Sequence, residues 1–372
     1  MYANDPKRTL AVHCGSGFDA GFSPYQSIRL RRYNAALSQG AANMDTKAAK
    51  DLIEATTSCD FSSYIKSYSG IATFFRTKHT PNFADTDIAL IGLPIDAGLT
   101  QRTGARHGPR EVRTQSCNVL YFNPLTEVSP LGMCRVRDIG DVPVQSAFNL
   151  EHMIDEIFAF YRELHAAKVI PITVGGDHSI TYPIIKALGA SEPLGLVHID
   201  AHFDTAETMS GSTLHHGSPF WNGVRDGVLD PKRTVHIAIR DPYTEFEKPF
   251  VDETGMTVID INRFHDLGIV NVVKKTREVI GSGPAYISFD IDGLDPAFAP
   301  GTGTPVVGGL TSYEAKRFLQ GLRGLNIVGG DVVEVSPPFD SAGITALAGA
   351  QMLFEILCLS AEAFAQRKKA GV

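Results

Sequence analysis

Aspartates and histidines gather in three short clusters, and their types suit hydrolysis assisted by metal ions. The clusters occupy residues 175–179, 200–204 and 290–292 and contribute two imidazoles and four carboxylates: His178, His202, Asp200, Asp204, Asp290 and Asp292. Four negative charges in one partly buried space repel one another unless cations compensate them. Two divalent ions would balance the charge, and oxygen and imidazole donors without thiolates favour Mn(II) over a structural zinc site. Such a pair, sharing bridging carboxylates, can activate water.

Taken alone, each cluster has a purely structural explanation. Asp177 and His178 after two glycines are typical of a helix cap, and Asp-x-Asp after a strand is typical of a solvated loop. However, each cluster directly follows a predicted strand, at residues 169–174, 194–199 and 285–289. Alternate residues of extended backbone point the same way, so Asp200, His202 and Asp204 can converge. The coincidence favours one shared site.

The remaining pattern predicts the elements that would carry these clusters. Further short apolar runs cover residues 88–92, 234–239, 257–261 and 327–335, and helical periodicity covers residues 149–167, 270–279 and 312–322. Strands that are apolar on both faces and alternate with helices are typical of an α/β fold, a mostly parallel sheet covered by helices on each side. In such sheets the active site lies at the carboxyl ends of the strands.

Composition and length limit the classes of function. Among the 372 residues, 34 basic and 41 acidic side chains leave a net charge of −7, which argues against charge-driven binding to nucleic acid or membrane. Residues 1–66 lack a clear pattern and are predicted to form an N-terminal arm or lid. Residues 67–372 are predicted to form a single catalytic domain, because no repeat or linker appears from residue 87 onward.

Three further features predict a cytoplasmic protein. The five cysteines are scattered and odd in number, as expected of reduced thiols. The first 21 residues contain no apolar segment typical of a signal peptide. Residues 346–365 form the most apolar stretch, but Gln351, Glu355 and Glu362 interrupt it, so we expect a buried C-terminal helix and no membrane span.

The motifs resemble those of the ureohydrolases, the arginase/agmatinase family, and specifically its agmatinase-like branch. The resemblance rests on the runs GGDHS (175–179), DAHFDT (200–205) and FDIDGLDPAFAPGTGTP (289–305). It implies a three-layer α/β/α arginase-like fold and assembly into homotrimers or homohexamers. It also implies hydrolysis of a guanidino group to urea and an amine at a dinuclear Mn(II) centre.

Carried over residue by residue, the resemblance implies two overlapping sets of ligands. One ion would be held by His178, Asp200, Asp204 and Asp290, and the other by Asp200, His202, Asp290 and Asp292. Asp200 and Asp290 would then bridge the ions. A bridging hydroxide would attack the guanidinium carbon, and Asp204 would orient it.

The resemblance also implies the residues that handle the substrate. An expelled amine needs a proton near neutral pH, where histidine titrates, and we expect His216 of the run HHGS (215–218) to donate it and to contact the substrate. Its neighbour His215 is expected on the loop surface. Glu334 would pair with the guanidinium, whose forked N–H groups suit a carboxylate. Trp221 would line the substrate pocket, and Asp177 would either cap a helix or orient a ligand histidine.

The substrate stays open between agmatine and other small guanidines: guanidinobutyrate, guanidinopropionate, free guanidine or a biguanide such as metformin. Arginine is disfavoured, because residues 205–208 read TAET where arginases carry an asparagine. Agmatinases are expected to carry IGIRG and RFGP where this chain reads IAIRD (237–241) and RHGP (106–109), and the substrate tail could be read at these places. Phe203, Trp221 and Tyr243 would suit a compact guanidine. For relatives that hydrolyse free guanidine, Ni(II) replaces Mn(II).

A second class of function is a non-catalytic or regulatory subunit, assembled with a related catalytic subunit. Such a subunit would lack a metal ligand or the acid, and none is missing here. Single-zinc deacetylase relatives of this fold lack the full set of six ligands, so His178 and Asp204 argue against that activity.

Overall fold

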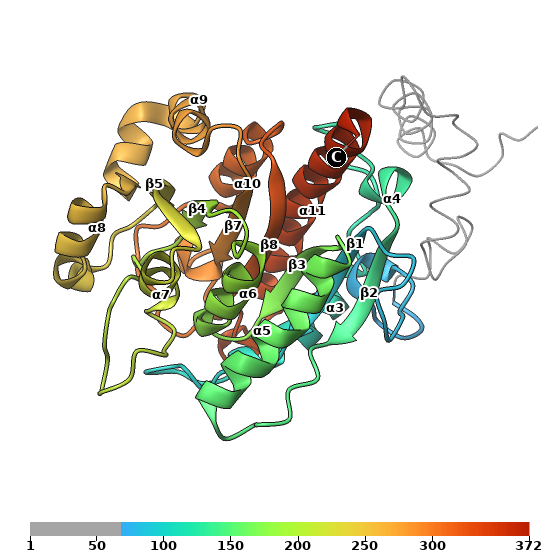
Figure 1. Ribbon diagram of the computed structural model, residues 1–372, viewed down its shortest axis with the longest axis horizontal. Helices are drawn as coiled ribbons and strands as arrows, with labels where there is room; N and C mark the ends of the chain where they lie inside the picture. Colours follow the sequence, from blue (N-terminus) through green and yellow to red (C-terminus); the bar gives the residue numbers. More distant parts are fainter. Residues whose placement is uncertain (1–67, 372) are drawn as a thin grey trace, which may run out of the picture.

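An eight-stranded parallel sheet forms the centre of the molecule (Figure 1). The structure, a computed structural model, describes residues 68–371, and the arm or lid predicted at residues 1–66 lies outside them. The strand order is β2-β1-β3-β8-β7-β4-β5-β6, and every pair of neighbours is parallel. The strands are β1 (Ile88–Leu93), β2 (Val136–Asp141), β3 (Ile170–Gly175), β4 (Leu194–Ile199), β5 (Leu229–Ile237), β6 (Thr257–Ile259), β7 (Ala285–Asp290) and β8 (Ile327–Val333).

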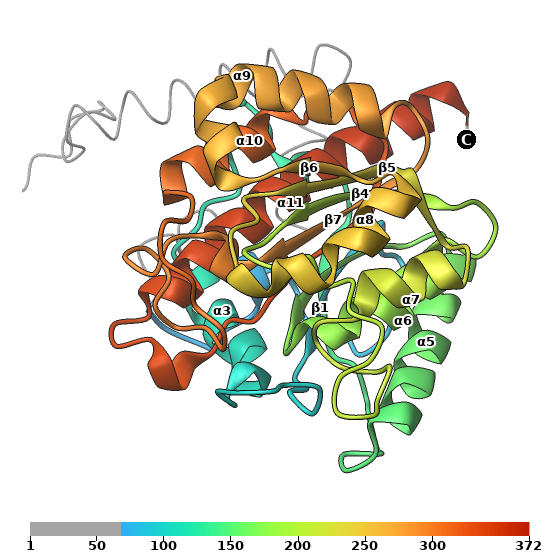
Figure 2. The same ribbon diagram turned by 90° about the vertical axis from the view of Figure 1, so that its left-hand side faces the viewer.

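Helices cover both faces of the sheet, which confirms the three-layer α/β/α prediction (Figure 2). One face packs against α5 (Leu150–Ala166), α6 (Thr181–Leu188) and α7 (Pro219–Arg225). The other packs against α3 (Gly108–Ser116), α9 (Ile261–Ile280), α10 (Ser312–Gly321) and α11 (Ile344–Ala370). Of two short helices, α4 (Pro130–Met133) adds Leu131 to the core that contains α11, and α8 (Lys248–Thr254) contributes Val251 to a smaller apolar cluster.

Burial on both faces explains why the central strands are continuous apolar runs. Every residue of β3, β4 and β7 is buried, and the helices on either side exclude water from both faces. The predicted bounds of β4 match the structure. The prediction for α5 also holds, since Asn149 caps it by accepting a hydrogen bond from the backbone N–H of His152 at 3.1 Å.

Some predicted bounds were wrong, for identifiable reasons. β5 begins at Leu229, before residue 234, because its polar start hid the strand pattern. β6 ends at Ile259, since Asp260 caps α9 and Ile261 already belongs to that helix. α9 spans twice the predicted segment and is interrupted at Gly268, which has φ +73°. β8 stops at Val333, because Glu334 turns away with φ +63°.

The C-terminal helix α11 is buried, as predicted. It is the only helix among residues 68–371 that is long and apolar enough to cross a membrane, and 78% of its most apolar window is buried inside the protein. The carboxylate of Glu355, which interrupts the apolar stretch, accepts hydrogen bonds from Asn123 and Gln320. These partners satisfy a charge that lipid would leave unpaired.

Candidate metal centre

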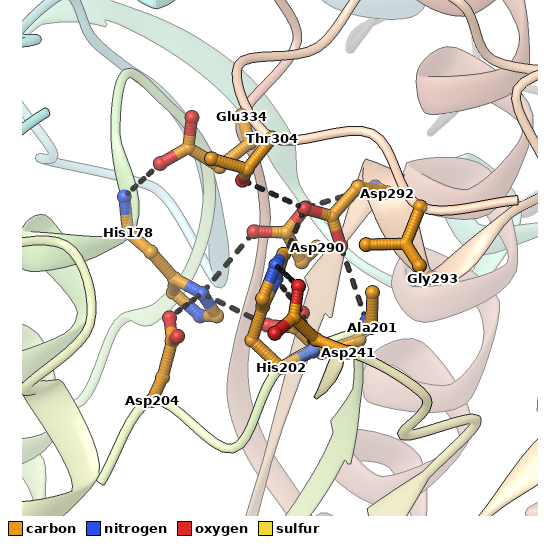
Figure 3. A network of polar contacts seen from close by, with 12 residues as sticks. His178, Ala201, His202, Asp204, Asp241, Asp290, Asp292, Gly293, Thr304 and Glu334 are labelled. Carbon is orange, nitrogen blue, oxygen red and sulfur yellow. Dashed lines mark hydrogen bonds and ion pairs between the residues drawn. The ribbon is translucent and has the colours of Figure 1, made fainter. Parts of the chain in front are cut away.

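Four adjacent strands end at one edge of the sheet and bring the three clusters together (Figure 3). His178 follows β3, Glu334 follows β8, and the second cluster follows β4. Asp290 ends β7, and Asp292 follows it. The turn after β3 requires glycine, because a Cβ on Gly176 would lie 1.9 Å from the carbonyl oxygen of Ile95.

Three carboxylates surround one nitrogen of His178. Its Nδ1 lies 2.8 Å from Asp204 Oδ2 and 3.3 Å from both Asp200 Oδ2 and Asp290 Oδ2. This nitrogen is buried and has no hydrogen-bond partner of acceptable geometry. Four donor atoms therefore converge on one region, and a set of this kind can ligate a metal ion.

A second group of donors forms around His202. Its Nδ1 lies 3.1 Å from Asp200 Oδ1 and 3.3 Å from Asp292 Oδ2. Asp200 thus presents one oxygen to each histidine. Asp290 Oδ1 accepts a hydrogen bond from the backbone N–H of Asp292 at 2.8 Å.

Burial and mutual repulsion raise the pKa of two of these carboxyl groups, whereas at Asp200 burial is outweighed by the charge of His198 and by hydrogen bonds from the neighbouring histidines, which hold its pKa well below its usual value. Burial, together with the charges of Asp292 and Asp200, raises the pKa of Asp290 well above its usual value. Burial and the charge of Asp200 also raise the pKa of Asp292. Excess negative charge of this kind is relieved by divalent cations. The six residues therefore form a donor set that suits divalent cations, and Asp200 presents one oxygen to each histidine.

Further side chains fix the orientation of the candidate ligands. His178 Nε2 lies 2.8 Å from Ser288 Oγ, which donates to Asp331 Oδ1 at 2.7 Å. On the other side, His202 Nε2 lies 3.3 Å from Asp241 Oδ2. Hydrogen bonds of this kind set the tautomer and the basicity of metal-binding imidazoles. Sequence reasoning missed these residues, although Ser288 stands two before Asp290 on the same side of β7.

The loop after β1 holds His216 beside the metal centre. The backbone N–H of His216 donates to the carbonyl of Gly98, and its Nε2 lies 2.8 Å from Thr100 Oγ1. Asp177 accepts from the N–H of Gly98 at 2.8 Å and also caps the turn at Ser179. Asp177 therefore acts through its capping and loop contacts, and no hydrogen bond joins it to the ring of His178 in the described structure.

Glu334 is buried beside His178 and His216, and one of its carboxylate oxygens lacks a hydrogen-bond partner among the described residues. Its Oε1 accepts from the backbone N–H of His178 at 2.9 Å and lies 3.8 Å from His216 Nδ1, while Oε2 is buried without a partner among the described residues. Burial and the charge of Asp177 raise the pKa of this carboxyl well above its usual value. An unpaired buried carboxylate oxygen can accept from a cation with forked N–H groups.

Several neighbouring residues lie elsewhere than expected. His215 is 5% exposed, so the prediction of a surface position was wrong. Trp221 stacks under the guanidinium of Arg225, whereas its neighbour Phe220 packs against His198 and His178. Phe203 is buried in an apolar cluster with Ile239, Val251 and Met256, and Tyr243 is 72% exposed, so neither forms the aromatic pocket expected with Trp221.

The departures from the agmatinase pattern are His107, Ala238 and Asp241, and the residues around them are engaged within the protein. Arg240, between two of them in the sequence, donates to backbone carbonyls, including those of Asp292 and Val306. Asp241 contacts His202, and Arg106 pairs with Asp96. These side chains support the site from outside, and the expectation that they read the substrate tail finds no support in their contacts.

Residues 86–359 match the sequence profile of the Arginase family. The chain belongs to the arginase family. It is 48% identical to the guanidinopropionase of Pseudomonas aeruginosa over 304 residues, which cover 81% of this chain and 95% of that protein. It is 42% identical to the mitochondrial agmatinase of Gallus gallus over 292 residues, 78% of this chain and 86% of that protein.

A solved structure shows the same arrangement of elements. The proclavaminate amidino hydrolase of Streptomyces clavuligerus superposes with a TM-score of 0.76 at 35% identity, covering 80% of this chain and 99% of that one. Together with the family match, these relatives establish the chain as a hydrolase of guanidino C–N bonds, of the agmatinase and guanidinopropionase kind. The family is one of binuclear metal hydrolases, and the described residues include candidate ligand groups for metal ions.

Proposed function

We propose that this chain hydrolyses a small guanidino compound to urea and an amine at a centre of two divalent metal ions. The observation that supports this best is the convergence of two imidazoles and four buried carboxylates beside Glu334 and His216. A non-catalytic subunit would have no need of such a complete set. The alternative of a regulatory role therefore has no feature in its favour.

The proposed ligands follow the two groups of donors and, for the second role of Asp290, the resemblance to the ureohydrolases. His178, Asp200, Asp204 and Asp290 would hold one ion, and Asp200, His202, Asp290 and Asp292 would hold the other. When bound, the two ions supply the Lewis acidity that activates a water molecule for hydrolysis. Mn(II) is the proposed metal, because oxygen donors predominate, and Ni(II) is the alternative that the assay below includes.

Two residues of the chain handle the substrate in this proposal. The free Oε2 of Glu334 accepts N–H groups of the guanidinium and orients its planar carbon toward the metal centre. His216, beside Glu334, protonates the nitrogen of the departing amine, which is otherwise a poor leaving group. Thr100 holds the ring of His216 by its contact with Nε2.

Among the substrates considered, guanidinopropionate has the strongest support from similarity, since the relative that is 48% identical is named a guanidinopropionase. Agmatine has the support of the avian agmatinase. Guanidinobutyrate, free guanidine and metformin complete the set. They share the guanidino group that Glu334 would bind and differ only in what lies beyond it.

The test is urea release by protein reconstituted separately with Mn(II) and Ni(II), across these five compounds and arginine. The variant that tests the role of Glu334 is Glu334→Gln, which keeps the shape of the side chain and removes the charge. We expect it to retain both metals and to lose roughly 10- to 100-fold in kcat/KM, the value of a charged hydrogen bond. Two bound metals without urea release from any compound would contradict the proposal.

A further inference from the structure

Two buried histidines lie behind the metal centre, outside the six proposed ligands. His198 on β4 and His236 on β5 are opposite each other in the sheet, and both are fully buried. His198 Nε2 lies 2.8 Å from Asp200 Oδ2, and His198 Nδ1 lies 2.8 Å from His236 Nδ1. His236 Nε2 lies 3.2 Å from the sulfur of Met256. The contacts form a chain that ends on a shared carboxylate.

We propose that His198 is a positioning residue for Asp200, and that His236 in turn holds the ring of His198. The hydrogen bond from His198 Nε2 fixes the plane of the carboxylate so that its two oxygens face the two ions. This inference rests on the proposed dinuclear centre and adds two residues to it. Neither residue touches the substrate or the reacting atoms.

The direction of the hydrogen bonds follows from the chemistry of the groups. A carboxylate can only accept, so the proton between His198 and Asp200 belongs to His198 Nε2. One of the two facing Nδ1 atoms must donate and the other accept. If His236 Nδ1 donates, His198 Nδ1 accepts and the proton of His198 is on Nε2. If His198 Nδ1 donates instead, His198 Nε2 also carries a proton, because it donates to Asp200. Either arrangement directs an N–H group at Asp200.

The geometry of Asp200 explains why its orientation matters for both ions. Its Oδ2 lies 3.3 Å from His178 Nδ1, and its Oδ1 lies 3.1 Å from His202 Nδ1. Rotation of this carboxylate would withdraw an oxygen from each group of donors at once. Ser288, in contrast, supports only His178. His198 is therefore expected to affect both ions, and Ser288 mainly one.

The surroundings of His198 make the hydrogen bond hard to replace. The ring of Phe220 lies against it, with centroids 4.4 Å apart, and Phe203 packs on His236 at 5.3 Å. In such a dry environment no bulk water can take over a lost hydrogen bond. The alternative role for His198 is that of a ligand, since its nitrogen, His178 and Asp200 lie close enough to hold an ion. If His198 is a positioning residue, a His198 variant still binds two ions at saturation, whereas if it is a ligand, the variant binds one.

Two substitutions separate the roles, because each keeps a different nitrogen. The amide nitrogen of His198→Gln can reach the position of Nε2, whereas His198→Asn retains only a group near Nδ1. We measure the two Mn(II) dissociation constants by competition with a chelating dye and the metal content at saturation. His198→Asn is expected to bind both ions about 10- to 100-fold more weakly, the usual effect of losing such a partner. His198→Gln is expected to recover most of the affinity.

The second residue gives an independent check. His236→Asn keeps a polar group opposite His198 Nδ1, and His236→Leu removes it. We expect His236→Leu to weaken both ions and His236→Asn to stay near wild type. His265→Asn, on the exposed side of α9, is the control without an expected effect. Thermal unfolding of each metal-free variant shows that it folds.

Distinct results would overturn the inference. Wild-type affinities in both His198→Asn and His236→Leu would show that Asp200 needs no such support. Equal losses of affinity in His198→Gln and His198→Asn would show that packing of the ring, and not its hydrogen bond, supports the site. A His198 variant that saturates at one ion would show that His198 is itself a ligand. A wild-type protein that binds fewer than two ions would contradict the proposed function itself.

Discussion

Asp200 is the residue on which both groups of donors depend, since each of its oxygens faces a different histidine. We expect Asp200→Ala to lose both metals and all urea release, because a shared ligand serves two ions. Metal content by mass spectrometry measures this. Asp252→Ala, an exposed change on α8, is the control. Full metal occupancy in Asp200→Ala would sink the assignment of a shared carboxylate.

His216 has a role that can be separated from metal binding. It contacts Thr100 and lies near Glu334, and no hydrogen bond or ion pair joins its ring to a proposed metal ligand in the described structure. We expect His216→Ala to keep two metals and to lose about 10²- to 10⁴-fold in kcat, the usual range for a general acid. Steady-state kinetics with the best substrate measures it. A wild-type rate would move the acid to His215 or to water.

The sequence pattern predicted the site residues that follow strands and missed those that extend into the site from loops. The alternation along β4 and β7 predicted that five carboxylates and imidazoles lie close together, as they do, and could also have revealed His198 and Ser288. Thr100 and Asp241 come from loops without a periodic pattern, and only the fold brings them to His216 and His202. No pattern within the sequence of a single loop indicates which other loop will lie next to it in the folded protein.

The turn between β3 and the following helix places His178, and its glycines make it tight. A Cβ on Gly176 would meet the backbone of Ile95, which cannot move aside like a flexible side chain. We expect Gly176→Ala to destabilise the fold by about 1–3 kcal/mol and to weaken metal binding, because His178 shifts with the turn. Urea unfolding and metal titration measure the two effects.

A matched control for this prediction lies at the start of α10. Thr311 caps that helix in a reciprocal arrangement with Glu314, and its side chain has no hydrogen bond to a proposed ligand in the described structure. Thr311→Ala should cost about 1 kcal/mol of stability through the lost cap and leave metal affinity unchanged. If both variants weaken the metals equally, general destabilisation and not the turn is responsible.

Elements were predictable where burial was uniform. The fully buried strands β3, β4 and β7 gave unbroken apolar runs, and their bounds were within one residue or two. The edge strand β2 was missed, because polar residues alternate through it and Asp138 within it pairs with Arg113. The short helices α3, α6, α7 and α8 carry too few turns for a clear helical period.

The whole molecule should depend on its metals for stability. Without cations, the buried carboxylates around Asp290 repel one another. Burial and the charges of Asp292 and Asp200 accordingly raise the pKa of Asp290 well above its usual value. Metal that binds only the folded state adds about 2.7 kcal/mol per ion at 100 times its Kd. We expect EDTA to lower Tm by several degrees and Mn(II) to restore it. An unchanged Tm in calorimetry would contradict the metal centre.

Assembly is the remaining prediction for the intact protein, and it follows the resemblance to the ureohydrolases. Tyr243 and Phe246 are exposed and stacked, with ring centroids 6.4 Å apart, on the loop that also carries Asp241. A neighbouring subunit would bury them. We expect light scattering after size-exclusion chromatography to give three or six times the 40.2-kDa subunit mass. A mass of one subunit would contradict this.

The order of the strands has a consequence for how the chain reaches this fold. β8 is the last strand to be synthesised, yet it lies at the centre of the sheet between β3 and β7, which do not pair with each other. Until β8 inserts, the strands form two separate ribbons, each with an exposed inner edge. Such non-local pairing is slow and leaves a nascent chain open to aggregation. Because Glu334 follows β8, this edge of the sheet is completed only when β8 has inserted between β3 and β7.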